Sequence, residues 1–246
     1  MEILGLDIGG TGIKGAIVDT QRGTLITERH RIPTPDPATP EAVVATVKEL
    51  VDFFNWKGLI GSGFPAAIRN EIVMTASNID KTWIGMNAAE AISKATGCKI
   101  HLLNDVDAAG TAEMMFGAGK GQKGVTIVAA AGTGIGTALF INGHLIPNTE
   151  LGFVMVNGMP GEHYAANSVR KNEELSWEEW GSRLNEYFQR LESLFYPDLF
   201  ILGGGVSKHF DKYAQYFELK TKILPAESKN EAGIIGAAIS AEETLT

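Results

Sequence analysis

The sequence predicts an α/β fold in which two lobes flank a central cleft. Strand-like apolar runs alternate with segments of helical periodicity along the 246 residues. Two glycine-rich turns, in residues 7–14 and 132–136, each join two strand-like runs in the manner of a hairpin tip. The chain is long enough for one large or two modest domains, and its 44% of apolar residues supplies a core for each.

The first lobe is expected to cover residues 1–107, in the order of three strands, a helix, a strand, a helix and a strand. Thr39-Pro40 opens the first helix, because proline is favoured at the first helical position and apolar residues then recur at helical spacing. The expected strands lie at residues 3–8, 13–18, 24–29, within 58–65 and at 99–103, and the expected helices lie at residues 40–54 and 88–95.

The second lobe is expected to cover residues 108–230, and the C-terminal helical segment, residues 231–246, is expected to complete the first lobe. Asn142-Gly143 is a strong signal for a hairpin turn. Residues 158–176 are polar and are predicted to be irregular. The other expected elements are a helix from after Asp107 to Phe116, strands at residues 125–131, 135–141 and 199–202, a long amphipathic helix at residues 177–195 and a last helix at residues 232–244.

The net charge and the single cysteine restrict the partners and the location of the chain. A formal charge of −8 argues against a nucleic-acid partner, because proteins that bind phosphate backbones carry clustered lysine and arginine. Cys98 alone cannot form an internal disulfide, and the sequence has neither a membrane-spanning apolar run nor a signal-type N-terminus. We therefore expect a cytoplasmic protein with no membrane partner. The histidines show no metal-ligand spacing.

The two glycine turns together describe a clamp for a phosphate chain. Glycine accepts backbone angles that other residues resist, and its missing side chain lets amide N–H groups point together at an anion. Asp7, at the start of the first turn, is a candidate for holding a hydrated magnesium ion. The residues expected to bind the phosphoryl donor are Asp7, Gly9, Gly10, Thr11, Gly12, Lys14, Gly132, Thr133, Gly134, Gly203 and Gly204.

Each glycine segment also has a purely structural interpretation. Glycine-rich hairpin turns are common, and Gly203-Gly204 after a strand is equally consistent with a plain turn. Residues 10–15 also spell the dinucleotide fingerprint, but that fingerprint must open a helix, whereas the chain here continues as a β-branched strand. A dehydrogenase is therefore disfavoured.

Candidate acceptor-binding residues follow the strands. Asn104 and Asp105 end an apolar strand, where α/β proteins place ligand-binding groups. Asp105 could take the proton from a substrate hydroxyl while Asn104 holds another hydroxyl, although aspartates at this point could also only cap the following helix. The polar and aromatic cluster at residues 78–83, which includes Asn78, suits a polyhydroxylated ring, and Glu150 is another hydroxyl-binding candidate. An ordinary loop turn and a solvated carboxylate are the alternatives for these last two.

Seven motifs in order resemble the ROK family of sugar kinases, and most closely its polyphosphate glucokinase branch. The resemblance covers nearly the whole chain and implies an actin-like ATPase (RNase H-like) fold, with the sugar at the base of the cleft and the phosphoryl donor above it. It implies that Asp105 is the catalytic base, that Asn78, Asn104 and Glu150 contact the sugar, and that the glycine turns are phosphate loops. The motifs are Asp7-Ile-Gly-Gly-Thr-Gly-Ile-Lys14, Gly63-Phe-Pro65, Asn78-Ile-Asp-Lys-Thr-Trp83, Leu103-Asn-Asp105, Gly132-Thr-Gly-Ile-Gly136, Asn148-Thr-Glu-Leu-Gly152 and Leu202-Gly-Gly-Gly205.

The resemblance also concerns cofactors and assembly. It implies magnesium, polyphosphate or ATP as the donor, and a homodimer. The cysteine-rich zinc motif of many ROK proteins is absent, so no zinc is expected. The sequence alone leaves the donor and the acceptor sugar open.

One departure from the resembling glucokinases concerns the acceptor. Phe153 and Met155 stand where those enzymes have a histidine and a glutamate near the sugar. Replacing hydrogen-bonding groups by apolar ones changes which hydroxyls a site can read. Two alternatives to a glucose-phosphorylating kinase therefore stay open: a kinase with altered sugar specificity, and a non-catalytic sugar- or phosphate-binding protein on a kinase scaffold.

Overall fold

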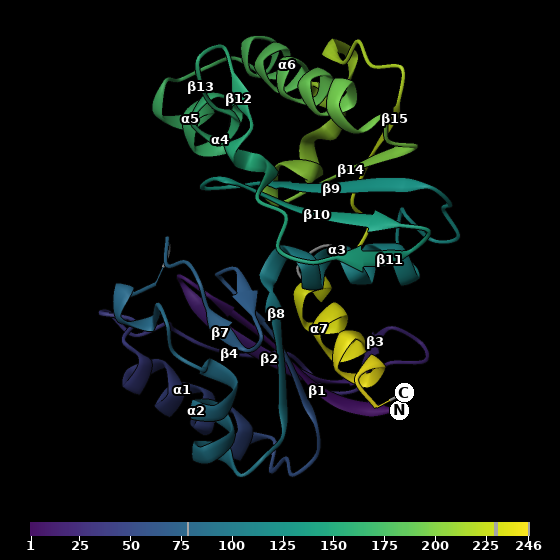
Figure 1. The fold of residues 1–246 in the computed structure, drawn as a ribbon. Helices are drawn as coiled ribbons and strands as arrows, with labels where there is room; N and C mark the ends of the chain where they lie inside the picture. The colour runs from purple at the N-terminus through teal and green to yellow at the C-terminus, as the bar shows by residue number, and fades with distance from the viewer. Residues whose placement is uncertain (78, 229–230, 246) are drawn as a thin grey trace. The chain divides into compact units, whose positions relative to one another are not determined.

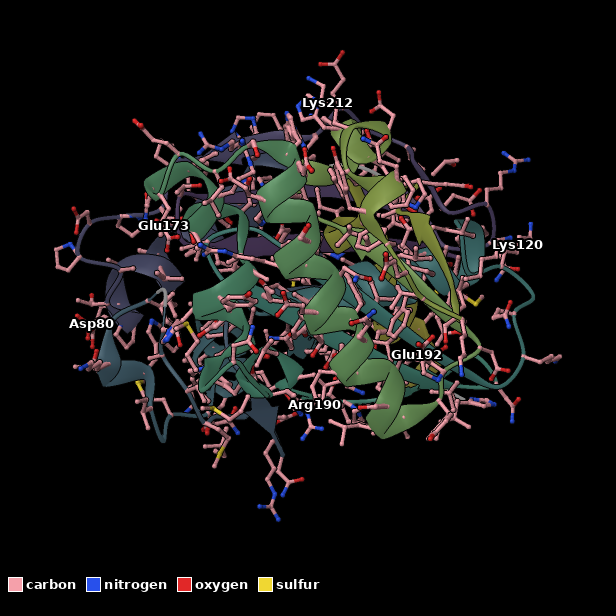
Figure 2. All side chains as sticks on the ribbon, turned by 90° about the horizontal axis from the view of Figure 1, so that it is seen from above. Asp80, Lys120, Glu173, Arg190, Glu192 and Lys212 are labelled. Carbon is pink, nitrogen blue, oxygen red and sulfur yellow. The ribbon has the colours of Figure 1, made fainter. Side chains whose placement is uncertain are left out.

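The computed structural model describes residues 1–77, 79–228 and 231–245. The chain divides into two compact units, one formed by Met1–Ala112 with Asn230–Thr246 and the other by Glu113–Lys229. The boundary expected after residue 107 falls inside helix α3 (Asp105–Phe116). The elements of each unit are labelled in Figure 1, and Figure 2 adds their side chains.

A mixed six-stranded sheet forms the centre of the first unit, in the order β3-β2-β1-β5-β8 with β4 also on β2. β1 and β2 pair antiparallel, whereas β1, β5 and β8 are parallel, so the carboxyl ends of these three strands meet at one edge. The strands are β1 (Glu2–Gly9), β2 (Gly12–Asp19), β3 (Thr24–Leu25), β4 (His30–Ile32), β5 (Ile60–Phe64) and β8 (Ile100–Asn104). A small hairpin, β6 (Ile68–Arg69) with β7 (Ile72–Val73), lies outside this sheet.

The third strand expected at residues 24–29 is split in the structure. β3 and β4 pair with opposite ends of β2, and just after β3 the N–H of Ile26 still donates to the Ile17 carbonyl at 2.7 Å. There the hydroxyl of Thr27 accepts a hydrogen bond from the backbone N–H of Ile17 at 3.0 Å. A side chain thus replaces a ladder partner, which strand-like composition does not predict.

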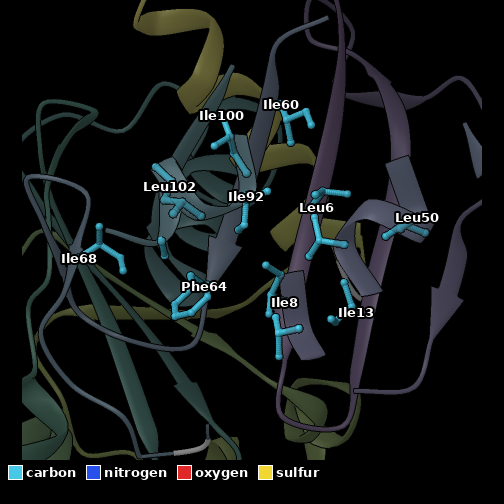
Figure 3. Close-up of a cluster of buried hydrophobic side chains, with 14 of the residues drawn as sticks. Leu6, Ile8, Ile13, Leu50, Ile60, Phe64, Ile68, Ile92, Ile100 and Leu102 are labelled. Carbon is cyan, nitrogen blue, oxygen red and sulfur yellow. The ribbon is translucent and has the colours of Figure 1, made fainter. Parts of the chain in front are cut away.

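Helices cover both faces of this sheet (Figure 1). α1 (Pro40–Phe53) and α2 (Ala88–Thr96) lie on one face, and α1 begins as expected, with the Thr39 hydroxyl accepting from the N–H of Ala42 and proline at the first helical position. Alternate residues of the strands, such as Leu6 and Phe64, pack against these helices in the cluster of Figure 3. α7 (Ala232–Glu243) packs on β1 and β5 from the opposite face.

The second unit is built on a five-stranded sheet, in the order β11-β10-β9-β14-β15. The Asn142-Gly143 turn between β10 and β11 is confirmed, since both residues have the positive φ that a tight hairpin needs, 53° and 85°. The strands are β9 (Val125–Ala131), β10 (Ile135–Ile141), β11 (His144–Ile146), β14 (Leu199–Gly203) and β15 (Lys222–Pro225), with a separate hairpin of β12 (Met155–Val156) and β13 (Met159–Pro160).

α6 (Trp177–Phe195) has the bounds that its periodicity predicts. A capping box fixes its start, because Ser176 and Glu179 bond each other's backbone N–H groups. Trp180, Leu184 and Phe188 are fully buried against the sheet.

The irregular segment expected at residues 158–176 is wrong, because it contains α4 (Gly161–Ala165) and α5 (Asn167–Asn172). Helices of 5 and 6 residues are too short to show a helical period. Three short 3-10 segments, η2 (Leu151–Phe153), η3 (Gly205–Lys212) and η4 (Ala214–Tyr216), complete this unit, and η1 (Lys81–Trp83) belongs to the first.

Two glycines of β5 provide a test of how closely α7 packs on the first sheet. A Cβ at Gly61 would lie 2.9 Å from the backbone nitrogen of Ala238 and nearer still to the carbonyl of Ala237. Gly61→Ala is therefore expected to lower the free energy of unfolding by about 1–3 kcal/mol, measured by urea denaturation. Gly63→Ala is the control, because its Cβ would meet Asp105 Cα at 3.4 Å, an ordinary contact. Equal losses in the two variants would contradict this packing.

Candidate functional site

The first glycine turn is a two-residue hairpin tip that carries two cations. Gly9 lies opposite Gly12 and Asp7 opposite Lys14, and the Lys14 Nζ donates to Asp7 Oδ2 at 2.9 Å. Lys14 is thus already paired with a carboxylate. Arg31, which the sequence reasoning missed, reaches the tip from β4 and donates from Nη2 to the carbonyl of Thr11 at 2.6 Å. The pairing of β4 with β2 places Arg31 beside the tip, and no local sequence pattern predicts this pairing.

Glycine is needed at positions 12 and 134 of these tips because a side chain would collide with neighbouring atoms, and not because the backbone has an unusual φ. Gly9, Gly12, Gly132 and Gly134 have no left-handed φ, so the expectation that conformational freedom explains them is wrong. A Cβ at Gly12 would lie 2.7 Å from Cζ of Arg31, and one at Gly134 would collide with a glutamate carboxylate. These glycines therefore let charged side chains approach the backbone.

The ends of three parallel strands bring two aspartates to the same face of the first sheet. Asp7 pairs in register with Gly63. Gly63 in turn lies beside Asp105, since a Cβ on it would be 3.8 Å from the Cβ of Asp105. The Asp7 carboxyl group points to the face covered by α7, where Gly233 leaves room for it. Because Gly63 has no side chain, β5 places none between Asp7 and Asp105.

Asn104, rather than an aspartate, is the main cap of α3. Its Oδ1 accepts from the N–H groups of Val106 at 2.8 Å and Asp107 at 3.1 Å, and its Nδ2 donates to the carbonyl of Ala66 at 3.2 Å. The helix therefore starts at Asp105, three residues before the expected start after Asp107. Asp105 also accepts from the N–H of Val106 at 2.9 Å, which helps to fix its carboxyl group.

A pocket of about 520 Å³ adjoins the first tip, lined by Gly10, by residues 34–38 and by Ser77, Ile79 and Asp80. Thr34 fixes this wall by donating from its hydroxyl to the carbonyl of Gly9 at 2.5 Å. Asn78, the predicted sugar contact of this loop, lies outside the described residues.

The aromatic member of the predicted sugar cluster at residues 78–83 is a structural residue. Trp83 is fully buried, packs edge-on against Phe64 and donates from its indole N–H to the carbonyl of Ala38 at 3.0 Å. Composition suggested an aromatic surface for a sugar ring, but the indole faces the core. The expectation for this one side chain is wrong.

The second glycine turn lies beside the end of β14. Gly203 pairs with Ala130, and Gly204 adopts a φ of 82° so close to β9 that a Cβ would be 2.7 Å from the carbonyl of Ala131. The structure thus brings together Gly132–Gly134 and Gly203–Gly204, which are far apart in the sequence. Only glycine fits at position 204.

Ser168, on α5, forms hydrogen bonds to the backbone of the second glycine turn. Its backbone N–H donates to the carbonyl of Gly132 at 3.0 Å, and its hydroxyl donates to that of Thr133. The sequence reasoning missed this residue because it treated residues 158–176 as irregular.

Two glutamates accompany the second turn. Glu150 precedes η2, and this segment runs along β10, where the Thr137 hydroxyl accepts from the N–H of Leu151 at 3.0 Å. Glu162 of α4 lies against Gly134. Desolvation of the carboxyl group and the negative charge of Glu162 raise the pKa of Glu150. The sequence reasoning found Glu150 but missed Glu162, which only the position of α4 reveals.

The two residues that depart from the resembling glucokinases are both exposed. Phe153 ends η2 and Met155 starts β12, and their exposed fractions are 53% and 54%. Neither is needed to fill the core of the second unit. Both follow Glu150 closely in the chain, so they belong to the same surface segment.

The chain is similar to known proteins in both sequence and structure. The model of the ROK family matches residues 3–156. The chain is also 44% identical over 243 residues to the polyphosphate glucokinase of Mycobacterium tuberculosis, which covers 98% of this chain and 92% of that protein. The chain belongs to the ROK family. Among its relatives, the polyphosphate glucokinase of Mycobacterium leprae is 42% identical over 98% of this chain and 75% of its own length.

Solved structures of ROK proteins share the fold. The polyphosphate/ATP-glucomannokinase from Arthrobacter sp. strain KM has a TM-score of 0.93 and 43% identity, covering 99% of both chains. A ROK glucokinase from Streptomyces griseus, solved with glucose and AMPPNP, has a TM-score of 0.84 at 23% identity over 99% of this chain and 100% of its own. This ROK protein therefore has the actin-like ATPase fold, and the predictions of family and fold are confirmed.

Two further observations concern metal-ligand groups and membrane-spanning helices in this ROK protein. Within the described residues, no three His, Cys, Asp or Glu side chains are grouped so that they could hold a metal ion. None of the described helices combines the length and apolar character that crossing a membrane requires.

The raised pKa of Glu150 has a testable effect on stability. Above its ordinary value of 4.5, the folded carboxyl group holds its proton longer than the unfolded one, so this group costs stability as the pH rises through that interval. Glu150→Gln should raise the melting temperature by about 1–2 °C at pH 8 and leave it unchanged at pH 4, measured by differential scanning fluorimetry. Glu218→Gln, at another exposed glutamate of the unit, is the control. An equal shift at both pH values would contradict the electrostatic cause.

Proposed function

We propose that this chain is a sugar kinase that transfers a phosphoryl group from polyphosphate or ATP to a hydroxyl of a glucose-like hexose. The observation that carries the proposal is the register of β1, β5 and β8, which sets Asp7 and Asp105 on either side of the bare backbone at Gly63. We assign Asp7 to the donor side of the reaction and Asp105 to the acceptor side. The 44% identity to a polyphosphate glucokinase supports the same reaction.

The donor phosphates are proposed to bind at the glycine turns. In the first unit these are Gly9, Gly10, Thr11 and Gly12, with Lys14 and Arg31 as cations. In the second unit they are Gly132, Thr133 and Gly134 together with Gly203 and Gly204, which lie side by side there. Fixed N–H groups and cations stabilise the charge that develops on the transferred group. Both donors share the terminal phosphates, so the turns serve either one.

Magnesium fits this arrangement. The ion keeps several waters and needs only one or two carboxylates besides the substrate phosphates. Asp7 is a partly exposed carboxylate beside a phosphate-binding turn, which is the type of ligand that such an ion takes. When bound, the ion neutralises charge on the donor phosphates.

Asp105 is proposed to act as the general base. A hydroxyl attacks phosphorus more readily when a carboxylate accepts its proton, and Asp105 is held by the start of α3 and by the N–H of Val106. The sugar contacts are proposed to be Asn78, Asn104 and Glu150, and we add Glu162 as a candidate because it lies against Gly134 and its charge acts on Glu150. Since the Asn104 side chain also caps α3, its loss would disturb Asp105 as well.

The exposure of Phe153 and Met155 favours a second candidate, a kinase of the same type with altered sugar specificity. Exposed apolar side chains offer a sugar contact surface but no hydrogen bonds. Such a site would prefer an acceptor that lacks, or substitutes, a hydroxyl which glucose presents.

We propose a homodimer, as the family resemblance implies, and a cytoplasmic location, which the single buried thiol Cys98 suits. Multi-angle light scattering measures the first and fractionation of the source cells the second.

The base assignment predicts the behaviour of an isosteric variant. Asp105→Asn should lower kcat at least about 100-fold, because the amide cannot accept the proton, while sugar binding changes little. Steady-state kinetics with glucose and both donors measures kcat, and a thermal shift with glucose measures binding. Asp52→Asn, an exposed aspartate of α1, is the matched control. Full activity of Asp105→Asn would remove Asp105 from this role.

The acceptor assignment predicts a gain in glucose use. The double variant Phe153→His with Met155→Glu restores hydrogen-bonding groups and should raise kcat/KM for glucose relative to other hexoses and amino sugars by about 10-fold or more. Met159→Glu, at an exposed methionine of β13, controls for the added charge. An unchanged ratio of kcat/KM values would show that these positions do not read the sugar.

The same assays separate a kinase from a non-catalytic binder. A folded protein that glucose stabilises but that turns over no acceptor with either donor would be a binder. The intact Asp105 and both glycine turns favour the kinase.

A further inference from the structure

A cluster of cationic side chains surrounds Trp177 at the start of α6. The Cζ atom of Arg170 lies 4.1 Å from the centroid of the indole ring, and the Nζ of Lys212 lies 5.6 Å from it. The ring of His209 is 5.5 Å away, and Tyr213 stacks on the indole at 5.7 Å. We call Arg170, Trp177, His209 and Lys212 the Trp177 cluster. An aromatic face that holds cations in place lowers the conformational entropy they would lose on binding an anion.

The cations of this cluster are available for an anionic ligand. Among the described residues, no carboxylate forms an ion pair with Arg170 or Lys212. Arg170 uses its Nε to donate to Asn167 Oδ1 at 3.2 Å, and together with the indole this contact fixes the plane of the guanidinium group. A planar guanidinium held in this way suits phosphate oxygens.

The acids nearby have other partners or stand at the rim. Glu173 pairs with Arg183 at 2.8 Å, and Glu179 accepts from the hydroxyl of Ser176 at 2.7 Å. Asp211 is exposed on η3 between His209 and Lys212, and its charge adds to burial in raising the pKa of Tyr213. The positive character of the cluster therefore comes mainly from Arg170 and Lys212.

The two elements that carry the cations of the cluster, α5 and η3, are both bonded to the glycine segments of the second turn. α5 is tied to Gly132 and Thr133 through Ser168, two residues before Arg170. η3 follows Gly204 directly, and its first turn is fixed by Ser207, which donates from N–H and hydroxyl to the Gly204 carbonyl at 3.1 and 3.0 Å. The exposed Lys208 comes next along η3. Arg170 thus follows Ser168 by two residues, and Lys208 and Lys212 follow Ser207 along η3, so cations come soon after both contacts with the glycine segments.

We infer that the Trp177 cluster binds the distal part of a linear polyphosphate whose terminal phosphate is held at the second glycine turn. The inference rests on the proposed function and adds the site that the remainder of the donor chain occupies. A polyphosphate carries charge along its whole length, so cations beyond the reacting end add to its binding. The chain has a net charge of −8, so a polyanion needs such a local basic surface. ATP has only three phosphates and does not extend as a polyanion past the turn.

The test compares donors of different length in one set of variants. Arg170→Ala with Lys212→Ala is expected to raise KM for long-chain polyphosphate about 10-fold, with kcat unchanged. KM for tripolyphosphate and for ATP should stay within about twofold. The double variant should also weaken the dependence of the long-chain KM on salt, because fewer ions are released on binding. Arg170→Lys should recover part of the loss, since it restores charge without the planar fork.

The control removes the same two residue types elsewhere on the unit. Arg190→Ala with Lys220→Ala does so, since Arg190 lies in the second half of α6 and Lys220 just before β15. Figure 2 shows Arg190 and Lys212 toward different ends of α6. Melting temperatures establish that each variant is folded. Unchanged KM for long-chain polyphosphate, or an equal rise for ATP, would overturn the inference and leave the proposed function intact. No turnover by the wild-type chain with any donor would overturn the proposed function itself.

Discussion

The parallel register between β1 and β5, in which Asp7 lies opposite Gly63, is the constraint on which the first unit depends. A shift of one residue would turn Leu6 and Ile8 out of the core and Asp7 into it, so the hydrophobic core and the carboxylate fix each other's positions. The same register carries over to β8, which delivers Asn104 and Asp105 to the same edge. Packing against α1 and α2 on one face thus sets the chemistry on the other.

The second unit reveals a compromise between binding and stability. Glu150 and Glu162 raise the local negative charge beside a turn that is proposed to hold phosphate. Carboxylates repel a polyanion but accept hydrogen bonds from hydroxyls, which agrees with the proposal that Glu150 contacts the sugar. The two carboxylates also repel each other, which lowers the stability of the folded protein. Such a loss of stability is common where residues are placed for function.

Much of the fold could be predicted because its signals are local. The glycine-rich tips, the Asn142-Gly143 turn and the stripe of α6 depend on neighbouring residues, and each has the predicted structure. Asp105 could be proposed as a site residue because a polar pair at a strand end is a positional signal. Its position at the first residue of α3 was not predicted, since the capping bonds of Asn104 depend on the loop geometry.

The rest of the site depends on contacts between distant segments. Arg31 reaches its turn through a strand pairing, Ser168 through a six-residue helix and Glu162 through one of five, and none of these has a sequence period. Trp83 was misjudged for the opposite reason, because its residue type suggested a surface that its packing denies. The residue types in the sequence were enough to predict the kind of chemistry. The direction in which each side chain points could be seen only in the structure.

The order of the elements along the chain has a consequence for synthesis on the ribosome. The second unit is one continuous stretch, Glu113–Lys229, so all of its strands are available once that stretch has emerged. The first unit lacks α7 until then, and the bare backbone at Gly5 and Gly61, on which α7 packs, stays open to water and to other chains. The first unit therefore begins to be synthesised before the second but is completed after it. During translation of the second unit, the sheet face that α7 will cover is exposed to aggregation.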